Sequence, residues 1–195
     1  MVFDGIIDRY VLASTEFGRR LRAVRPEQWT WPTPCGEWNV RQLVNHMTRG
    51  NLGYAHLSQG ATNADFLRER DLDALGTDPV GAYQESMAGC ASAFGHPGAL
   101  DRMLDYPLGK ITGAQALAVR TTDSVIHTWD LARAIGADDR LHPELVTWID
   151  EHLTEIYADL AESPIANTTH RFFAAPTGDP GHTTQDRVLH LMGRP

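Results

Sequence analysis

The clearest helical segment of the chain is residues 112–136, which read TGAQALAVRTTDSVIHTWDLARAIG. Its composition is that of a helix, rich in alanine and without proline. Thr112 and Gln115 form a capping-box pattern at its start, in which each side chain accepts a hydrogen bond from a free backbone N–H of the first turn. Gly136 follows where glycine commonly ends a helix. We therefore predict one long helix over residues 114–135.

The rest of the chain also reads as a series of helices. Apolar residues recur at three-to-four spacing, and proline, glycine and good capping residues bound the periodic segments. Asn39 with Gln42 is a second capping-box pattern, and Asp78 before Pro79 suits the start of another helix. The further helices that we expect cover residues 4–24, 39–57, 78–94, 143–161 and 184–192.

The connecting segments contain no convincing strand. Residues 26–38 are a loop rich in proline and tryptophan, residues 60–77 are a loop or a short helical piece, and residues 96–111 are a connection. No run alternates between apolar and polar residues for long enough to predict a strand, and residues 165–175 come nearest to one. Helices joined by moderate loops favour an all-α fold in the form of an antiparallel bundle.

Composition and charge argue against several classes of function. The chain of 195 residues has 25 acidic and 17 basic residues, a net charge of −8, and no dense cluster of Lys and Arg, so we expect no nucleic-acid or anionic-membrane partner. No apolar run approaches the roughly 18 residues of a membrane-spanning helix. Acids stand at the N-terminus where a signal peptide would be basic. The two cysteines, Cys35 and Cys90, form no disulfide framework, which favours the reducing cytoplasm.

One constellation of residues has the spacing of a metal site. Asp123 and His127 stand four apart, which places both side chains on one face of the long helix. His46 borders the apolar stripe of the helix over residues 39–57, and a bundle that packs these helices together brings it towards the pair. Two imidazoles and one carboxylate are a ligand set of catalytic zinc, with a position left open for water or substrate. The alternatives are a helix-surface ion pair and a hydrogen-bonded, partly buried histidine.

Two further residues near these candidates have open roles. In one interpretation, Asp130 accepts a hydrogen bond from His127 on the side away from the metal and so fixes its tautomer. In the other, Asp130 forms a salt bridge with Arg133 or Arg120. Cys35 is either a structural residue, a nucleophile or an extra ligand, and no basic residue adjoins it in the sequence to favour a reactive thiolate. No glycine-rich phosphate loop or dinucleotide motif is present, so nucleotide and hydride chemistry are not indicated.

Separated blocks of the sequence resemble the DinB-like metal-binding superfamily. The first block is residues 31–46, WPTPCGEWNVRQLVNH, and the second runs from Asp123 to Gly136. Residues 185–195, QDRVLHLMGRP, resemble the usual ending of one actinobacterial branch. That branch includes the N-terminal domain of mycothiol-dependent maleylpyruvate isomerase.

The resemblance implies a four-helix DinB-like bundle with short extra helical segments, as a single domain over residues 1–195. It implies that His46, Asp123 and His127 hold a divalent metal, zinc first and nickel second. The family usually carries glutamate in place of Asp123, whose side chain is one methylene shorter. The resemblance also implies mycothiol as a co-substrate, an electrophilic small-molecule substrate and a homodimer.

We therefore expect a thiol-dependent transferase or isomerase that uses an open zinc position. A metal-assisted hydrolase with the same ligands is one alternative. A non-catalytic metal-binding or interaction protein is the other.

Overall fold

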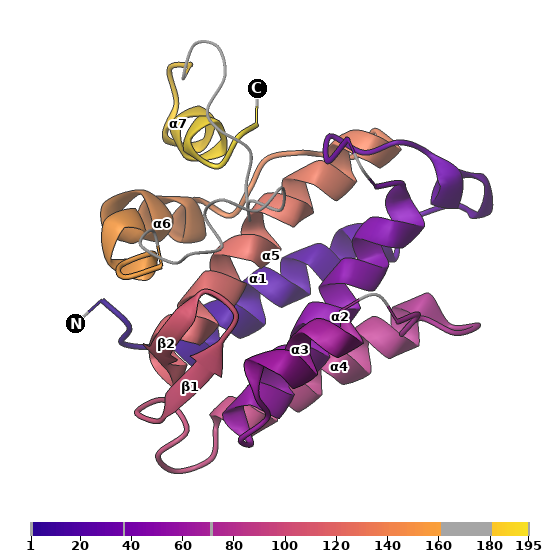
Figure 1. The fold of residues 1–195 in the computed structure, drawn as a ribbon. Coiled ribbons are helices and arrows are strands. Elements are labelled where there is room, and N and C mark those ends of the chain that lie inside the picture. Colours follow the sequence, from indigo (N-terminus) through magenta and orange to yellow (C-terminus); the bar gives the residue numbers. More distant parts are fainter. Residues whose placement is uncertain (1, 37, 71, 161–180, 195) are drawn as a thin grey trace.

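The computed structural model describes residues 2–36, 38–70, 72–160 and 181–194, and helices dominate it (Figure 1). The all-α prediction is confirmed. In chain order the elements are α1 (Ile6–Leu21), a short 3₁₀ helix η1 (Pro26–Thr30), α2 (Val40–Ser58), α3 (Asn63–Glu69), α4 (Pro79–Phe94), β1 (Met103–Tyr106), β2 (Gly109–Thr112), α5 (Gly113–Ile135), α6 (Pro143–Ile156) and α7 (Thr184–Leu191).

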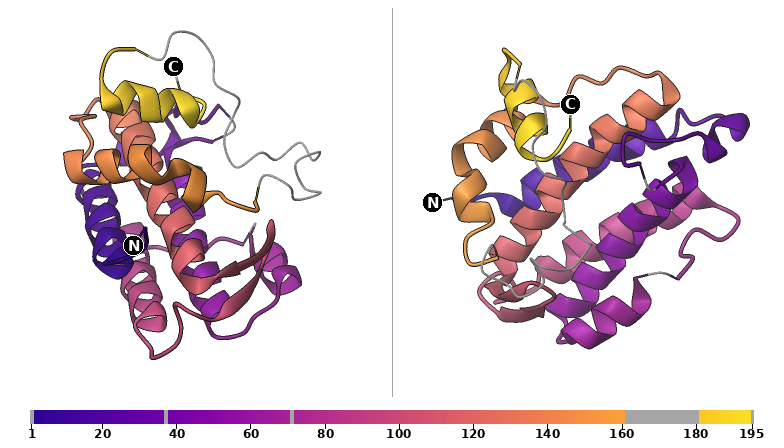
Figure 2. Two further views of the ribbon diagram at one scale, coloured as in Figure 1. Left: turned by 90° about the vertical axis from the view of Figure 1, so that its left-hand side faces the viewer. Right: turned by 45° about the horizontal axis from the view of Figure 1, so that its top comes forward.

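Four long helices, α1, α2, α4 and α5, form the bundle. Helices α1 and α2 each pack against both α4 and α5, so the four surround a common core (Figure 1). Helix α1 contributes one apolar face, with Tyr10 and Phe17 fully buried. Helix α5 also contacts the strands and α6, and it is buried almost all round. Helix α7 packs on α6 and lies outside the bundle (Figure 2).

The ends of these helices agree with most of the predicted capping. The side chain of Asn39 accepts from the backbone N–H of Gln42, and the Gln42 side chain accepts from the N–H of Asn39, each at 2.9 Å, which confirms that capping box. Gly136 ends α5 with a left-handed φ of 69°. Helix α6 ends at Ile156 rather than near residue 161, because Asp159 adopts a left-handed φ of 63°.

Of the two hydrogen bonds predicted for the capping box of Thr112 and Gln115, only one is formed. The Thr112 hydroxyl accepts from the backbone N–H of Gln115 at 3.2 Å, as predicted. The Gln115 side chain does not return this bond but donates to the carbonyls of Ile156 and Ala158, at 3.4 and 2.8 Å. These carbonyls lie at and just beyond the end of α6, where the last turn of a helix lacks partners of its own. The amide of Gln115 thus joins the end of α6 to the start of α5.

A β-hairpin occupies the segment that was predicted as a plain connection, so that prediction is wrong. Strands β1 and β2 pair antiparallel, with Leu104 opposite Ile111 and Tyr106 opposite Gly109. Each strand has only four residues, too few for a clear alternation of apolar and polar side chains. Gly109 takes a φ of 138°, which glycine adopts most readily.

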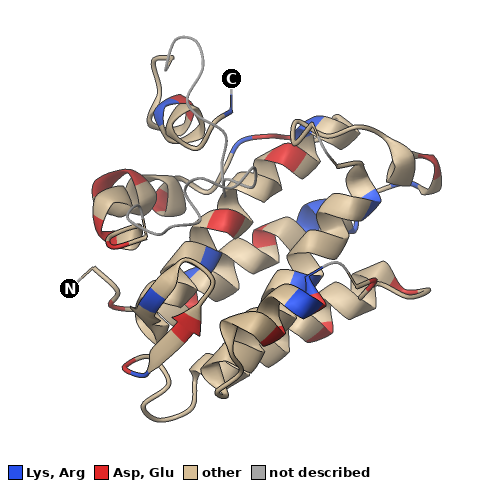
Figure 3. Ribbon diagram, in the orientation of Figure 1, with Lys and Arg blue, Asp and Glu red and all other residues tan. Residues whose placement is uncertain are grey.

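The remaining predictions about the fold have different outcomes. The polar stretch over residues 60–77 contains α3, the short helical piece that was one of its two interpretations. The strand considered over residues 165–175 lies outside the described residues. None of the helices in the described part of the chain has the length and hydropathy that a membrane crossing needs. In the view of Figure 3, basic and acidic residues are mixed over the bundle helices. The single domain over residues 1–195 stays a prediction.

Candidate metal centre

Helix α5 carries a row of charged residues through the middle of the fold. Arg120, Asp123, His127 and Asp130 follow one another at spacings of three and four, so they share one face of the helix. All four are buried, and Asp123, with 8% of its surface exposed, is the most accessible. Helix α2 brings His46 towards this face. Burying several charges together is costly unless they pair with one another, so their contacts define the site.

The three predicted ligands lie together. Nε2 of His127 is 3.2 Å from Oδ1 of Asp123, and Nε2 of His46 is 3.4 Å from Oδ2 of the same carboxylate. One ligand atom from each residue can be chosen so that all lie within 4.8 Å of one another. The Asp123–His127 pair is buried, so its interpretation as a helix-surface ion pair is wrong. Arg120 completes the group with an ion pair from Nη1 to Oδ2 of Asp123.

One nitrogen of this group lacks a hydrogen-bond partner among the described residues. Nε2 of His46 is buried and makes no hydrogen bond to any described residue, and its 3.4 Å approach to Asp123 does not have hydrogen-bond geometry. The indole of Trp38 stacks on the His46 ring, with centroids 4.4 Å apart and planes at 29°. About a third of the His46 side chain, 32%, is exposed, although Nε2 itself is buried. A buried polar atom without a partner needs an explanation, and a divalent ion fits these donors.

The protonation states suit a metal only in part. Burial raises the pKa of Asp123, but the adjacent His127 and His46 outweigh burial and hold that pKa well below its usual range. Burial lowers the pKa of His46, and the attraction of Asp123 does not compensate. Burial also acts to lower the pKa of His127, but Asp123 and Asp130 overcome it and raise that pKa well above its usual value. An ionised carboxylate and a neutral imidazole are ligand forms, whereas His127 must release a proton to bind an ion.

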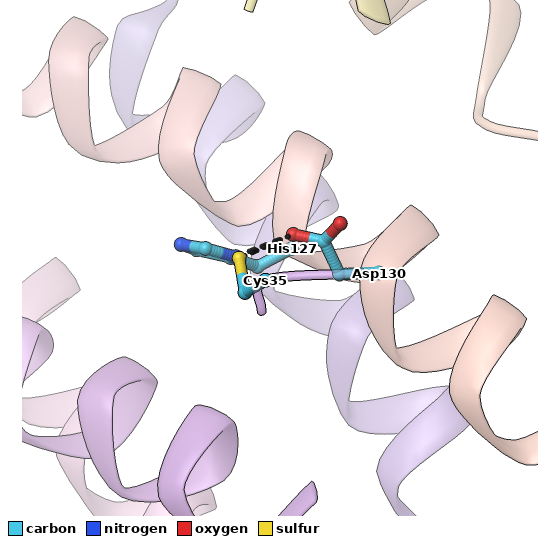
Figure 4. Close-up of side chains that lie close together, drawn as sticks. All are labelled: Cys35, His127 and Asp130. Atoms are coloured by element: carbon cyan, nitrogen blue, oxygen red, sulfur yellow. Dashed lines mark hydrogen bonds and ion pairs between the residues drawn. The ribbon is translucent and has the colours of Figure 1, made fainter. Parts of the chain in front are cut away.

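A second cluster lies at the other edge of His127 (Figure 4). Nδ1 of His127 is 2.8 Å from Oδ2 of Asp130, and the Cys35 thiol lies 3.3 Å from that oxygen and 3.8 Å from Nδ1. Arg194 donates from Nε to Oδ1 of Asp130 at 3.0 Å and from Nη2 to the Cys35 sulfur at 2.9 Å. His127 thus presents one ring nitrogen to Asp123 and the other to Asp130.

The partners of Asp130 differ from part of the prediction. The contact with His127 is the one expected of a carboxylate that fixes a tautomer, while that role itself stays a prediction. The alternative salt bridges are wrong, because Arg133 pairs with Asp139 and Arg120 pairs with Asp123.

Sequence reasoning missed Arg194 altogether, because the residue lies 159 positions beyond Cys35. A signal was nevertheless present. Cys35 lies in the first of the blocks that carry the family resemblance, and Arg194 lies in the C-terminal one. Cys35 sits at Nδ1 of His127, whereas Asp123 sits at Nε2, so Cys35 and Asp123 do not belong to one ligand set.

Comparisons with known proteins identify the family to which the chain belongs. Residues 11–132 match the model of the mycothiol maleylpyruvate isomerase N-terminal domain. Two uncharacterised proteins of Mycobacterium tuberculosis, from strains CDC 1551 and H37Rv, are each 35% identical over 133 residues, which is 68% of this chain and 69% of theirs.

Two solved structures share the fold. The crystal structure of the mycothiol-dependent maleylpyruvate isomerase aligns with a TM-score of 0.61 at 14% identity, over 78% of this chain and 69% of that one. A histidine-to-alanine mutant of that enzyme aligns with a TM-score of 0.59 at 13% identity, over the same shares. At such low identity these likenesses show the fold alone, whereas the family model spans more than half of the chain. The chain therefore belongs to the family of mycothiol maleylpyruvate isomerase N-terminal domains.

Proposed function

We propose that this protein binds one divalent ion, zinc first and nickel second, through His46, Asp123 and His127. We propose further that it uses the ion in a reaction that depends on mycothiol. The observation that carries the proposal is the buried Nε2 of His46, which has no hydrogen-bond partner among the described residues and faces Asp123. The thiol comes from the family, whose name and solved structures specify mycothiol.

The short side chain of Asp123 does not argue against the site. Its two oxygens already lie 3.2 Å from His127 and 3.4 Å from His46. Two ligand atoms that each lie roughly 2.0–2.2 Å from a tetrahedral zinc ion are roughly 3.3–3.6 Å apart, which is close to these separations. The loss of one methylene relative to glutamate is therefore compatible with binding.

The surrounding residues orient the ligands and control their protons. The Asp130 carboxylate accepts a hydrogen bond from Nδ1–H of His127, so Nε2 of His127 is the ring nitrogen left to bind the ion. Arg120 holds Oδ2 of Asp123, and Trp38 covers one face of the His46 ring. A bound zinc ion supplies a Lewis acid that lowers the pKa of a thiol at its open position.

The reaction class that fits is thiol-dependent transfer or isomerisation of an electrophilic small molecule. A thiolate is the reactive nucleophile in both, since it adds to a polarised double bond or displaces a leaving group. A cytoplasmic location, a homodimer and the absence of nucleic-acid partners stay predictions.

A cobalt-loaded protein tests the proposal directly. The Cys35→Ser variant is used, because Cys35, His127 and Asp130 form a second group of possible ligands, and cobalt bound there through the Cys35 sulfur would give a sulfur-to-cobalt band of its own. Addition of mycothiol to this variant should produce a near-ultraviolet sulfur-to-cobalt absorption band, and S-methyl mycothiol, the matched control, should not. The His127→Ala variant should show no band with either compound.

The same experiment separates the alternatives. Bound cobalt without a thiol band, together with turnover of esters or amides, would favour a metal-assisted hydrolase. Bound cobalt with neither band nor turnover would favour a non-catalytic metal-binding or interaction protein. Either result contradicts the role of mycothiol and leaves the metal site standing.

A further inference from the structure

The C-terminal segment that follows α7 ends in a buried ion pair. The Arg194 side chain is almost fully buried, although it lies close to the end of the chain. It meets Asp130 with two donors, Nε to Oδ1 at 3.0 Å and Nη2 to Oδ2 at 2.5 Å. Such a bidentate pair fixes both the distance and the plane of the carboxylate. Arg194 therefore sets the orientation of Asp130.

Asp130 passes this orientation on to His127. The carboxylate is fully buried, and its Oδ2 is also 2.8 Å from Nδ1 of His127. Without Arg194, Asp130 would be a buried charge whose partners among the described residues are His127 and the Cys35 thiol. A carboxylate in that position is expected to turn or take up a proton, and the His127 ring would lose the acceptor that holds its Nδ1–H.

We propose that Arg194 is a positioning residue, which acts through Asp130 to keep Nε2 of His127 directed at Asp123 and His46. The expected effect on metal binding rests on the metal site proposed above, whereas the contacts that join Arg194, Asp130 and His127 do not depend on it. Docking of the C-terminal segment and metal binding then stabilise each other, because coupling between two sites is reciprocal. The segment is thus part of the metal centre although it provides no ligand.

An ion pair of the preceding helix, α7, offers a matched control. Arg187 of α7 pairs with Asp150 of α6, with Nε 2.7 Å from Oδ1. This pair joins α7 to α6, and no contact between either member and His127, Asp130 or Asp123 is found among the described residues. A loss of metal affinity in Arg194→Ala but not in Arg187→Ala would therefore separate positioning from general tethering of α7.

Zinc affinity is the first measurement, made by competition with a chromogenic chelator. Arg194→Ala should bind zinc about 10-fold to 100-fold more weakly than the wild type, the usual effect of removing a group that supports a ligand. Arg187→Ala should bind zinc as the wild type does. Arg194→Lys should recover only part of the loss, because an ammonium cannot form the bidentate pair. Millimolar guanidinium, well below denaturing concentrations, should restore affinity to Arg194→Ala by filling the vacated space.

A second measurement does not need the metal. Proton NMR of the zinc-free protein should show the Nδ1–H of His127 as a slowly exchanging downfield resonance, because Asp130 accepts it in a buried site. Arg194→Ala should lose or strongly broaden this resonance, and Arg187→Ala should keep it. Arg194→Lys serves if the alanine variant does not fold.

The outcomes separate this inference from the proposed function. An unchanged His127 resonance in a folded Arg194 variant would overturn the positioning role, whatever the zinc affinity. Wild-type zinc affinity in that variant would overturn the coupling. Failure of the wild type to bind zinc would contradict the metal site, while the NMR comparison would still decide whether Arg194 positions His127.

Discussion

Two carboxylates of α5, Asp123 and Asp130, flank the same histidine but have different surroundings. Each contacts His127, Asp123 at Nε2 and Asp130 at Nδ1, and each is paired with an arginine. The arginine of Asp123 is Arg120, one turn earlier on the same helix. The arginine of Asp130 is Arg194, which lies 64 residues further along the chain.

The difference between the two clusters is the basis on which we assign the proposed cation to Asp123 rather than to Asp130. Around Asp130, the guanidinium of Arg194 already spans both carboxylate oxygens, and the thiol of Cys35 takes up the remaining space. Around Asp123, His46 contributes a buried nitrogen without a hydrogen-bond partner among the described residues. Both clusters bring three possible ligands together, so proximity alone does not identify the metal site. The buried Nε2 of His46, which has no hydrogen-bond partner among the described residues, is the reason that the proposed site lies at Asp123.

The largest effect on stability is expected at Arg120. This side chain is almost fully buried and donates to the Met47 carbonyl at 2.6 Å and to the Asn51 side chain at 2.9 Å, besides pairing with Asp123. Arg120→Met removes the arginine partner of the buried Asp123 carboxylate and the donors to Met47 and Asn51, so the free energy of unfolding should fall by about 3–5 kcal/mol. Urea denaturation of the zinc-free protein measures it. Arg133→Met, which removes an exposed arginine, is the control, and equal losses in both variants would contradict the account.

A pair of isosteric substitutions compares the two carboxylates directly. Asp123→Asn removes a charged ligand and should abolish detectable zinc binding in chelator competition. Asp130→Asn removes only the support of His127, so affinity should fall about 10-fold to 100-fold. Equal effects of the two substitutions would show that the carboxylates do not differ in role.

Acid titration compared between the wild type and Asp130→Asn probes the contribution of Asp130. Burial raises the pKa of Asp130, but His127 and Arg194 outweigh burial and lower it to about 2. Because this pKa lies below the unfolded value of about 3.9, the carboxylate contributes stability above that pH, and this is lost as the pH falls through about 2. The contribution is on the order of 2 kcal/mol.

Unfolding free energies of the zinc-free protein along a pH series measure this contribution. Asp130→Asn should flatten the decline between about pH 4 and pH 2. Asp150→Asn, at the more exposed partner of Arg187, should flatten it less. A wild-type slope in Asp130→Asn would contradict the buried ion pair with Arg194.

The smallest effect is expected at Gly50, where α2 passes Arg120. A Cβ at this position would lie 2.5 Å from Nη1 of Arg120, which is held by several buried contacts and cannot retreat. Gly50→Ala should therefore lower the free energy of unfolding by about 1 kcal/mol, because overpacking outweighs the better helix propensity of alanine. Gly89→Ala on α4, where nothing lies within 4 Å, should raise it by about as much. Thermal or urea denaturation compares the two, and stabilisation in both would contradict the close contact.

Local spacing explains which parts of the fold and site could be predicted. The helices and the Asp123–His127 pair follow from periodicity and capping within a few turns of chain. The position of His46 required the packing of α2 against α5, which the family resemblance supplied. The Arg120–Asp123 pair was missed although its spacing of three is local, because Arg120 was considered only as a partner of Asp130.

Contacts between distant segments could not be predicted in this way. Neither periodicity nor residue spacing near Cys35 or Asp130 indicates Arg194, because the ion pair depends on how the residues after α7 pack against α5. Gln115 was likewise diverted from its capping box by the end of α6, which only the folded chain brings near. The hairpin was missed because strands of four residues show too little alternation.

Metal stoichiometry is the most direct test of the proposed site at His46, Asp123 and His127. The protein is purified without a metal-chelating tag, and bound metal is measured by elemental mass spectrometry beside His46→Ala and His127→Ala. We expect about one zinc or nickel ion per wild-type chain. Both variants should lose the ion and keep the circular dichroism spectrum of a helical protein. A wild type that stays free of metal after incubation with zinc at neutral pH would contradict the account.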